Sequence, residues 1–447
     1  MNISKKFLYT QFFGVTLYIL QFIPYISIAM SISISISIIY FFHKSKLEYS
    51  LFFILLFSVL STSGTNIYTF KIMGINLFYI TLLILFISLI YKNKKELTKI
   101  PKLLFFYMFL ILVVLIYSIS NLFESVLFFT KDLIIIIIIP TLIVILFRKT
   151  NSQMIVDTFI NIMSIKILAS LLMYAMGLTL VQDENMFDVL SIDNGDELGS
   201  LFVVILLSLV FIKRISSDKW VFILFFITLF GLFQYGLGFA GLGSQVMMMI
   251  LIVLVYFGLK KKIFFIPSLL IFLLILNIDK TGNEAIDYKI QNITELFSNL
   301  NQDDIYLIPH SPQVRVIELI NIASYPWYNI LFGHGIGGYF TDSHLEFNQY
   351  IGKYDFSEYE IDTRKFYNPH NLAYNFLKFG LLWQIFLVYL LYKAIRQTSG
   401  DIRMFLVLSL FTLSLNMGYA IKTSILFGIL LIMLHNSNQR KVVAKTN

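Results

Sequence analysis

Residues 131–149 read Lys-Asp-Leu-Ile-Ile-Ile-Ile-Ile-Ile-Pro-Thr-Leu-Ile-Val-Ile-Leu-Phe-Arg-Lys, an apolar run that ends at two basic residues. A helix needs about 20 predominantly apolar residues to cross the hydrocarbon core of a bilayer. This run comes close to that length, and similar runs recur along the whole chain. The pattern therefore predicts a protein that crosses a membrane many times.

The composition supports this prediction. Hydrophobic residues make up 58% of the chain and charged residues only 13%, more apolar surface than a water-soluble fold can bury. The net charge is +8, but the basic residues lie in short clusters between apolar runs. Such clusters follow the positive-inside rule of membrane proteins and exclude nucleic acid as the expected partner. Cysteine is absent, which excludes disulfides and thiolate chemistry.

We predict an all-α protein with about fourteen membrane-spanning helices. Their approximate bounds are 7–23, 25–42, 49–63, 72–91, 103–120, 131–147, 154–176, 198–213, 220–236, 244–259, 263–279, 370–392, 404–417 and 420–435. Ser and Ile alternate over Ser31–Ile38 as in a strand, but an isolated strand in lipid leaves its backbone unpaired, so a helix is predicted. Lys5 and Lys6 precede the first run as in a signal peptide; because no small-residue cleavage site follows, we expect a retained helix.

The charges of the connections predict the orientation. If the N-terminus is cytoplasmic, every even-numbered span ends at a basic cluster. These clusters lie at 44–46, 92–102, 148–149, 213–219, 260–262, 393–403 and 440–445. The connection at 183–197 on the opposite side contains acidic residues and no basic one. Both termini are therefore predicted to be cytoplasmic.

One long segment interrupts the series of spans. Residues 1–279 contain predicted helices 1 to 11, residues 280–369 form a large extracytoplasmic loop, and residues 370–447 contain helices 12 to 14 and a basic cytoplasmic tail. Connections of this length are usually functional or disordered. The loop is rich in aromatic residues, and Val314–Ala323 has helical apolar spacing, so an ordered, partly helical loop is predicted.

Three features follow one another near the end of this loop. Arg315 lies near the start of the helical stretch. Residues 331–339, Leu-Phe-Gly-His-Gly-Ile-Gly-Gly-Tyr, form a glycine-rich turn whose amides, including those of Gly335 and Gly337, can approach a ligand or another chain closely. Residues 369–371, Pro-His-Asn, then start a membrane helix.

His370 and Arg315 are the residues best suited to chemistry. A histidine at the membrane boundary titrates near neutral pH and can reach both lipid-borne and aqueous substrates, so His370 is the candidate general base. Arg315 is the candidate phosphate ligand, because a guanidinium offers paired donors to phosphate oxygens. Taken singly, a histidine at a helix start is more often a capping or interfacial residue, and a loop arginine is more often solvated.

The order of these features resembles the C-terminal signature of the O-antigen polymerase and ligase family, the Wzy-type membrane glycosyltransferases. The resemblance covers residues 310–385 in detail and the rest of the chain only in hydropathy and in the late large loop. It implies a GT-C-like fold in the bacterial cytoplasmic membrane and metal-independent transfer of an oligosaccharide from undecaprenyl pyrophosphate. It also implies that His370 takes the proton from the acceptor hydroxyl and that Arg315 binds the pyrophosphate.

The chain departs from this family at one position. The family usually has a Ser-Arg pair where residues 243–245 read Gly-Ser-Gln, and Gln245 brings a hydrogen-bond donor but no charge. A second cation could come from the loop before His370 or from the helix after it. The candidate substrate-binding residues are therefore Arg315, Arg364, Lys365, Lys378, Gln245, Asn371, Gly335 and Gly337. We interpret Lys131 and Asp132 as an interfacial ion pair.

Three functions stay open at this point: a polymerase of lipid-linked glycan repeat units, a ligase that transfers glycan to lipid A core, and a lipid-linked oligosaccharide flippase. The long loop and the lack of an internal repeat disfavour the flippase. A polymerase is preferred to a ligase because substrate-specific polymerases tolerate a divergent site. The expected partners are the undecaprenyl-pyrophosphate-linked oligosaccharide, membrane lipids and a chain-length regulator. No cofactor is expected, and no metal, because His310, His334 and His344 lack metal-ligand spacing.

Overall fold

The computed structural model of this protein describes residues 5–20, 23–60, 71–72, 75–92, 102–175, 310–347, 356–415 and 421–446. These residues are predominantly helical; the antiparallel strands β1 (Lys71–Ile72) and β2 (Ile75–Asn76) form a minimal hairpin. The all-α fold class is thus confirmed for the described residues. The four predicted spans from 198 to 279, and Gln245 among them, lie outside the described residues.

The helices fall into two stretches of chain. The first stretch contains α1 (Lys5–Leu20), α2 (Pro24–His43), α3 (Leu47–Leu60), α5 (Leu77–Lys92), α7 (Lys102–Tyr117), α8 (Ile119–Glu124), α9 (Val126–Asp132), the π-helix η1 (Leu133–Ile138), α10 (Ile139–Phe147) and α11 (Ser152–Ala175). The second contains α17 (His310–Ala323), α18 (Trp327–Phe332), α20 (Glu358–Thr363), α21 (Asn371–Gln397), α22 (Gly400–Leu415) and α23 (Ile421–Thr446).

The spans predicted within the described residues correspond to helices. The Ser-Ile alternation lies inside α2, so the prediction of a helix there is confirmed. In the part of the chain that the structure describes, three helical segments are long and apolar enough to cross a membrane: Tyr25–His43, Val126–Phe147 and Leu372–Gln397. Length and composition of this kind are the properties of an α-helical membrane protein.

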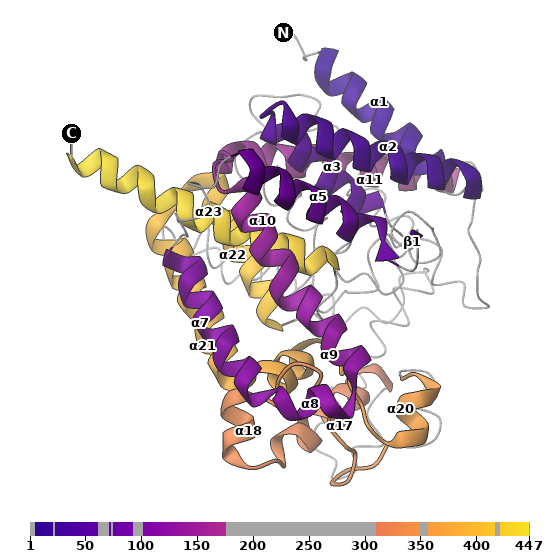
Figure 1. The fold of residues 1–447 in the computed structure, drawn as a ribbon, viewed down its shortest axis with the longest axis vertical. Helices are drawn as coiled ribbons and strands as arrows, with labels where there is room; N and C mark the ends of the chain where they lie inside the picture. Colours follow the sequence, from indigo (N-terminus) through magenta and orange to yellow (C-terminus); the bar gives the residue numbers. More distant parts are fainter. Residues whose placement is uncertain are drawn as a thin grey trace, which may run out of the picture.

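Helices far apart in the sequence lie together (Figure 1). α7 and α21 run side by side, with the rings of Phe106 and Phe386 centred 5.6 Å apart and those of Tyr107 and Trp383 6.1 Å apart. α1, α2, α3, α5 and α11 form another group, which lies above α7 and α21 in this view. The helices of the late loop, α17, α18 and α20, gather around α8 and α9 at the bottom of the view.

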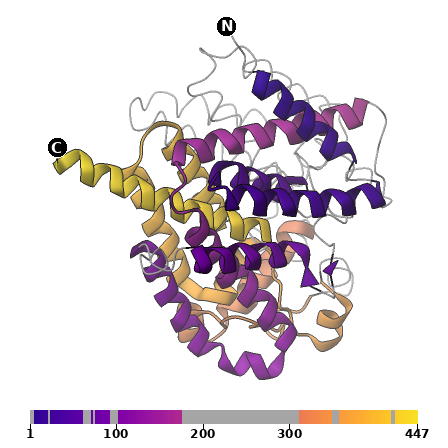
Figure 2. The ribbon, with the colours of Figure 1, turned by 45° about the horizontal axis from the view of Figure 1, so that its top comes forward.

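The late loop has a small hydrophobic core of its own. α17 buries one apolar face in it, and phenylalanines from the loop and the start of α21 complete it; its buried members are Val314, Ile317, Ile322, Phe340, Phe347, Phe356, Phe366, Ala373 and Leu377. Phe340 and Phe366 also pair through their backbones. The turned view in Figure 2 again shows the orange loop segments next to the purple helices around α8 and α9. This core attaches the loop to the start of α21.

α21 contains a break at Gly380, where φ is 61° and ψ is −159°. A side chain would not fit there, because a Cβ on Gly380 would lie 2.5 Å from the backbone nitrogen of Gly333. A Cβ on Gly333 would likewise lie 2.5 Å from the backbone nitrogen of Phe379. The two glycines allow the glycine-rich turn and the broken helix to touch through their backbones.

We expect Gly380→Ala to destabilise the protein by at least about 2 kcal/mol, because alanine combines positive φ with a backbone clash. The thermal unfolding midpoint of detergent-solubilised protein measures this. Leu381→Ala is the matched control, since Leu381 is the next residue of the helix and is 41% exposed. Equal midpoints for Gly380→Ala and the wild type would contradict the close backbone approach.

Candidate active site

The glycine-rich turn completes the hydrogen bonding of the broken helix. A break at Gly380 deprives carbonyls one turn earlier of their helical donors. The turn supplies replacements: the backbone N–H of His334 donates to the carbonyl of Leu377 (2.5 Å), and that of Gly335 donates to the carbonyl of Lys378 (3.1 Å). The turn is therefore built into α21 at the level of Lys378.

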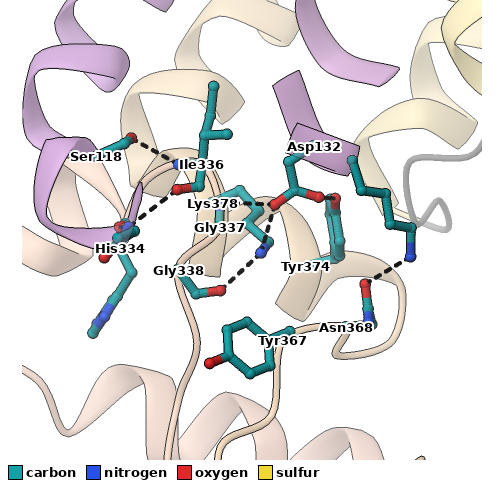
Figure 3. A network of polar contacts seen from close by, with 12 residues as sticks. Ser118, Asp132, His334, Ile336, Gly337, Gly338, Tyr367, Asn368, Tyr374 and Lys378 are labelled. Carbon is teal, nitrogen blue, oxygen red and sulfur yellow. Dashed lines mark hydrogen bonds and ion pairs between the residues drawn. The ribbon is translucent and has the colours of Figure 1, made fainter. Parts of the chain in front are cut away.

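Side chains near α8 hold the other side of the turn. The backbone N–H of Ile336 donates to the hydroxyl of Ser118 at 2.8 Å (Figure 3). The amide of Asn121 donates to the carbonyl of His334 at 2.6 Å. Gly335 approaches Ser118 so closely that a Cβ on the glycine would overlap the hydroxyl. The turn is thus enclosed between two segments that lie more than 200 residues apart in the sequence.

A buried ion pair lies at the centre of this arrangement. The ammonium of Lys378 lies 2.8 Å from Oδ2 of Asp132 and donates to the carbonyl of Gly338 at 2.7 Å. The same carboxylate accepts the backbone N–H of Gly337 and the hydroxyl of Tyr374, each at 2.9 Å (Figure 3). Both charged side chains are almost completely buried, at 1% and 2% exposure. Each member of the pair also has hydrogen bonds to other groups, and such bonds help to offset the cost of burying the two charges.

This network corrects the predicted pairing of Asp132 and shows which protein groups Lys378 and the glycine amides contact. Asp132 was predicted to pair with Lys131 at the membrane interface; it pairs instead with Lys378, because the fold brings α21 against α9, while the ammonium of Lys131 lies 3.3 Å from Oδ1 of Asn368. The amides of Gly335 and Gly337 bind a backbone carbonyl and a carboxylate of the protein itself. In this structure Lys378 and these amides therefore hold the turn in place.

His370 and Glu318 form the second polar cluster. His370 is the residue that precedes α21, and its Nδ1 lies 2.7 Å from Oε1 of Glu318, while its backbone N–H lies 3.0 Å from both carboxylate oxygens. The Glu318 side chain has no exposed surface, whereas that of His370 is 29% exposed. A buried carboxylate thus fixes an imidazole whose ring reaches the surface, which is the arrangement of a catalytic histidine and its orienting acid.

Arg315 belongs to the same cluster. It lies three residues before Glu318 on α17, nearly one helical turn away. Burial raises the pKa of Glu318; the hydrogen bonds and charge of His370, and less strongly the charge of Arg315, oppose this shift. Glu318 therefore contacts one of the two predicted residues, His370, and lies about one helical turn from the other, Arg315.

Sequence reasoning missed Glu318. The residue lies four positions after Val314, on the same face of α17 as the buried Ile317 and Asn321. A carboxylate on the apolar face of a short helix needs a partner, because an unpaired buried charge is costly. That position in the sequence was the available signal, but nothing in the sequence indicated which residue the partner is.

The remaining candidates lie elsewhere in the loop and at the start of α21. The guanidinium of Arg364 pairs with Asp342 and is half exposed. The ammonium of Lys365 lies 3.4 Å from Glu124 and 4.4 Å from the centre of the Tyr339 ring. Asn371 is the first residue of α21.

No protein-family model, curated protein or solved structure matches this chain. Within the described residues, no group of three or more His, Asp or Glu side chains is placed to hold a metal ion. The chemistry of the site is therefore inferred from its own side chains.

We expect Asp132→Asn to cost about 3 to 5 kcal/mol of stability, because it leaves the ammonium of Lys378 buried without a counter-charge. The double variant Asp132→Asn/Lys378→Met should lose less stability than the sum of the losses of Asp132→Asn and Lys378→Met. Unfolding midpoints in detergent measure this interaction energy between the two side chains. Lys131→Met, at the exposed neighbouring lysine, is the control and should cost less than about 1 kcal/mol. Strict additivity would show that the two side chains do not interact.

His334 predicts a dependence of stability on pH. Burial and the charge of Lys378 lower its pKa from 6.5 to about 4. Between these two pKa values the unfolded chain binds more protons than the folded one. The contribution of neutral His334 to the free energy of unfolding is therefore fully present above about pH 6.5 and is lost as the pH decreases. At pH 5 the free energy of unfolding is lower by about 2 kcal/mol than at high pH because of this residue. His334→Asn should lack this part of the loss, and parallel pH curves of unfolding midpoint for variant and wild type would refute the assignment.

Proposed function

We propose that this protein is a membrane glycosyltransferase that polymerises polysaccharide repeat units, of an O-antigen or a capsule. It transfers a glycan from undecaprenyl pyrophosphate onto a lipid-linked repeat unit at the outer face of the bacterial cytoplasmic membrane. The observation that carries the proposal is the contact of Glu318 with His370 beside Arg315, within the sequence signature that resembles the O-antigen polymerase and ligase family.

The proposed reaction uses His370 as the general base. With Nδ1–H donating to Glu318, Nε2 has the lone pair that accepts the proton of the acceptor hydroxyl. The acceptor oxygen then bonds to the anomeric carbon of the donor glycan as the bond from that carbon to the pyrophosphate oxygen breaks. Glu318 stabilises the imidazolium that results, as the acid of a catalytic triad does.

Arg315 serves the leaving group in this mechanism. The pyrophosphate gains negative charge as the glycosidic bond breaks, and a fixed guanidinium stabilises that charge through paired hydrogen bonds. Arg315 is half-buried on α17, next to the residue that orients the base. Donor phosphate and acceptor hydroxyl would therefore be held close together at one small cluster.

The topology belongs to the same proposal. The proposed topology has about fourteen spans, a large extracytoplasmic loop at 280–369 and cytoplasmic termini. In this topology His370 lies where the loop meets a membrane helix at the outer face. The alternation of basic clusters along the sequence supports this orientation. Lipid-linked repeat units carry their sugars at that boundary, and the site would meet them there.

A deletion strain tests the reaction class. Surface glycolipids separated on a gel should show glycan truncated to a single repeat unit when the gene is removed. Full-length polymer left on the lipid carrier and missing from its final acceptor would instead identify a ligase. Repeat units trapped on the cytoplasmic face would identify a flippase.

In that strain, we expect complementation with His370→Ala or Glu318→Gln to lower polymer formation by about 100-fold or more, the usual contribution of a positioned base. Glycan length on gels and initial rates in membrane vesicles measure this. Matched controls are His344→Ala and Glu358→Gln, since both residues are exposed in the same loop. A His370→Ala protein at normal level that still makes full-length glycan would overturn the assignment.

A further inference from the structure

Four aromatic rings form a cluster next to the proposed base, here called the tyrosine platform: Phe128, Tyr339, Tyr359 and Tyr367. The rings of Phe128 and Tyr367 are stacked, with centroids 4.0 Å apart and planes 4° apart. Tyr359 lies 6.2 Å from Phe128 and 6.4 Å from Tyr367, and Tyr339 lies 5.4 Å from Tyr367. The rings come from α9, from α20 and from the loop segments on either side of α20.

A buried carboxylate fixes the platform. Glu360 is only 4% exposed and forms a capping box with Ser357 at the start of α20, which orients the adjacent Tyr359. Its other oxygen accepts the backbone N–H of Tyr367 at 2.8 Å and that of Asn368 at 3.2 Å. The segment that leads to His370 is therefore held against α20 by one side chain.

The platform is surrounded by polar groups at the surface. Lys365 has its ammonium 4.4 Å from the centre of the Tyr339 ring and 3.4 Å from Glu124, and these two charged side chains are 38% and 44% exposed. On another side, the ammonium of Lys131 lies 3.3 Å from Oδ1 of Asn368. Cations, carboxylate and amide therefore border the rings.

Exposure separates the structural rings from those that can meet a ligand. Tyr367 is 1% exposed and belongs to the interior of the loop, so its role is to support the others. Tyr359 is 51% exposed, although it lies on a helix that is capped and packed in place. A large apolar ring that is both ordered and half exposed beside polar side chains is suited to recognition.

The chemistry of this surface matches a carbohydrate. A pyranose ring has a C–H face that packs on an aromatic ring and a rim of hydroxyls that bind amides, carboxylates and ammonium groups. Binding sites combine apolar lining with a few placed polar groups in this way. Tyr367 lies three residues before His370, and three extended residues span at most about 11 Å. The platform is thus within the length of a short oligosaccharide from the proposed base.

We infer that the tyrosine platform is a glycan-binding subsite, in which the exposed face of Tyr359 stacks on one sugar ring and the bordering polar side chains, Lys365, Glu124 and Asn368, bind hydroxyls of the same glycan. This inference rests on the proposed function, because the glycan it binds is the one the enzyme transfers. It adds a second point of attachment beyond the reacting sugar, so the platform contributes to affinity and to the choice of repeat unit.

Equilibrium binding tests the subsite without requiring turnover. The probe is oligosaccharide released by mild acid from the surface glycan of the bacterium that encodes the protein, titrated into the purified full-length protein in detergent. Tyr359→Ala should weaken binding about 5- to 10-fold, consistent with the loss of one aromatic contact. Tyr359→Phe, which keeps the ring, should bind within about 2-fold of the wild type. Tyr328→Ala, at a 41% exposed tyrosine on α18, is the control.

The outcomes separate the two proposals. If Tyr359→Ala binds the oligosaccharide as tightly as the wild type, or if the wild type does not bind it, the subsite is overturned. If Tyr359→Ala loses binding while His370→Ala still makes full-length glycan, the subsite stands and the catalytic assignment fails. The unfolding midpoint of Tyr359→Ala, expected to change little because the ring is half exposed, shows that lost binding is not lost folding.

Discussion

The arrangement of the described site depends on the ion pair between Lys378 and Asp132. Removing two charges from water costs several kcal/mol for each ion, and only close pairing with further hydrogen bonds offsets that cost. Here the further bonds come from the backbone of Gly337 and Gly338 and from the hydroxyl of Tyr374. The pair is satisfied only when α9, the glycine-rich turn and α21 are all in place, so it specifies one arrangement of three segments.

The site follows from that arrangement. Lys378 lies about two helical turns after His370 on α21, so fixing the lysine against α9 also limits where the start of the helix lies. The small phenylalanine core attaches α17 to the same end of α21, which brings Glu318 to His370. The buried charges thus divide into two sets: one holds the framework, and the other lies where a surface histidine can exchange protons.

Much of this could be predicted from residue patterns, and the failures have a common cause. Each span predicted within the described residues contains a helix, and the helical stretch containing Arg315 is α17, although the predicted span 72–91 begins in the β1–β2 hairpin and α23 continues past residue 435 to Thr446. Lys378 was predicted as a substrate-binding cation without an assigned partner in the protein, and Asp132 was assigned to Lys131. Glu318 was missed altogether. Each error concerns a partner that is distant in sequence.

The sequence by itself determined the apolar helices, their approximate bounds and the residues suited to chemistry at the late loop, because hydrophobic runs and residue types are local properties. Only the tertiary structure decided that Glu318 holds His370, that Asp132 pairs with Lys378 and that the glycine amides bind the protein itself. Pairing a buried polar group requires a partner within about 3 Å, and folding can supply that partner from anywhere in the chain.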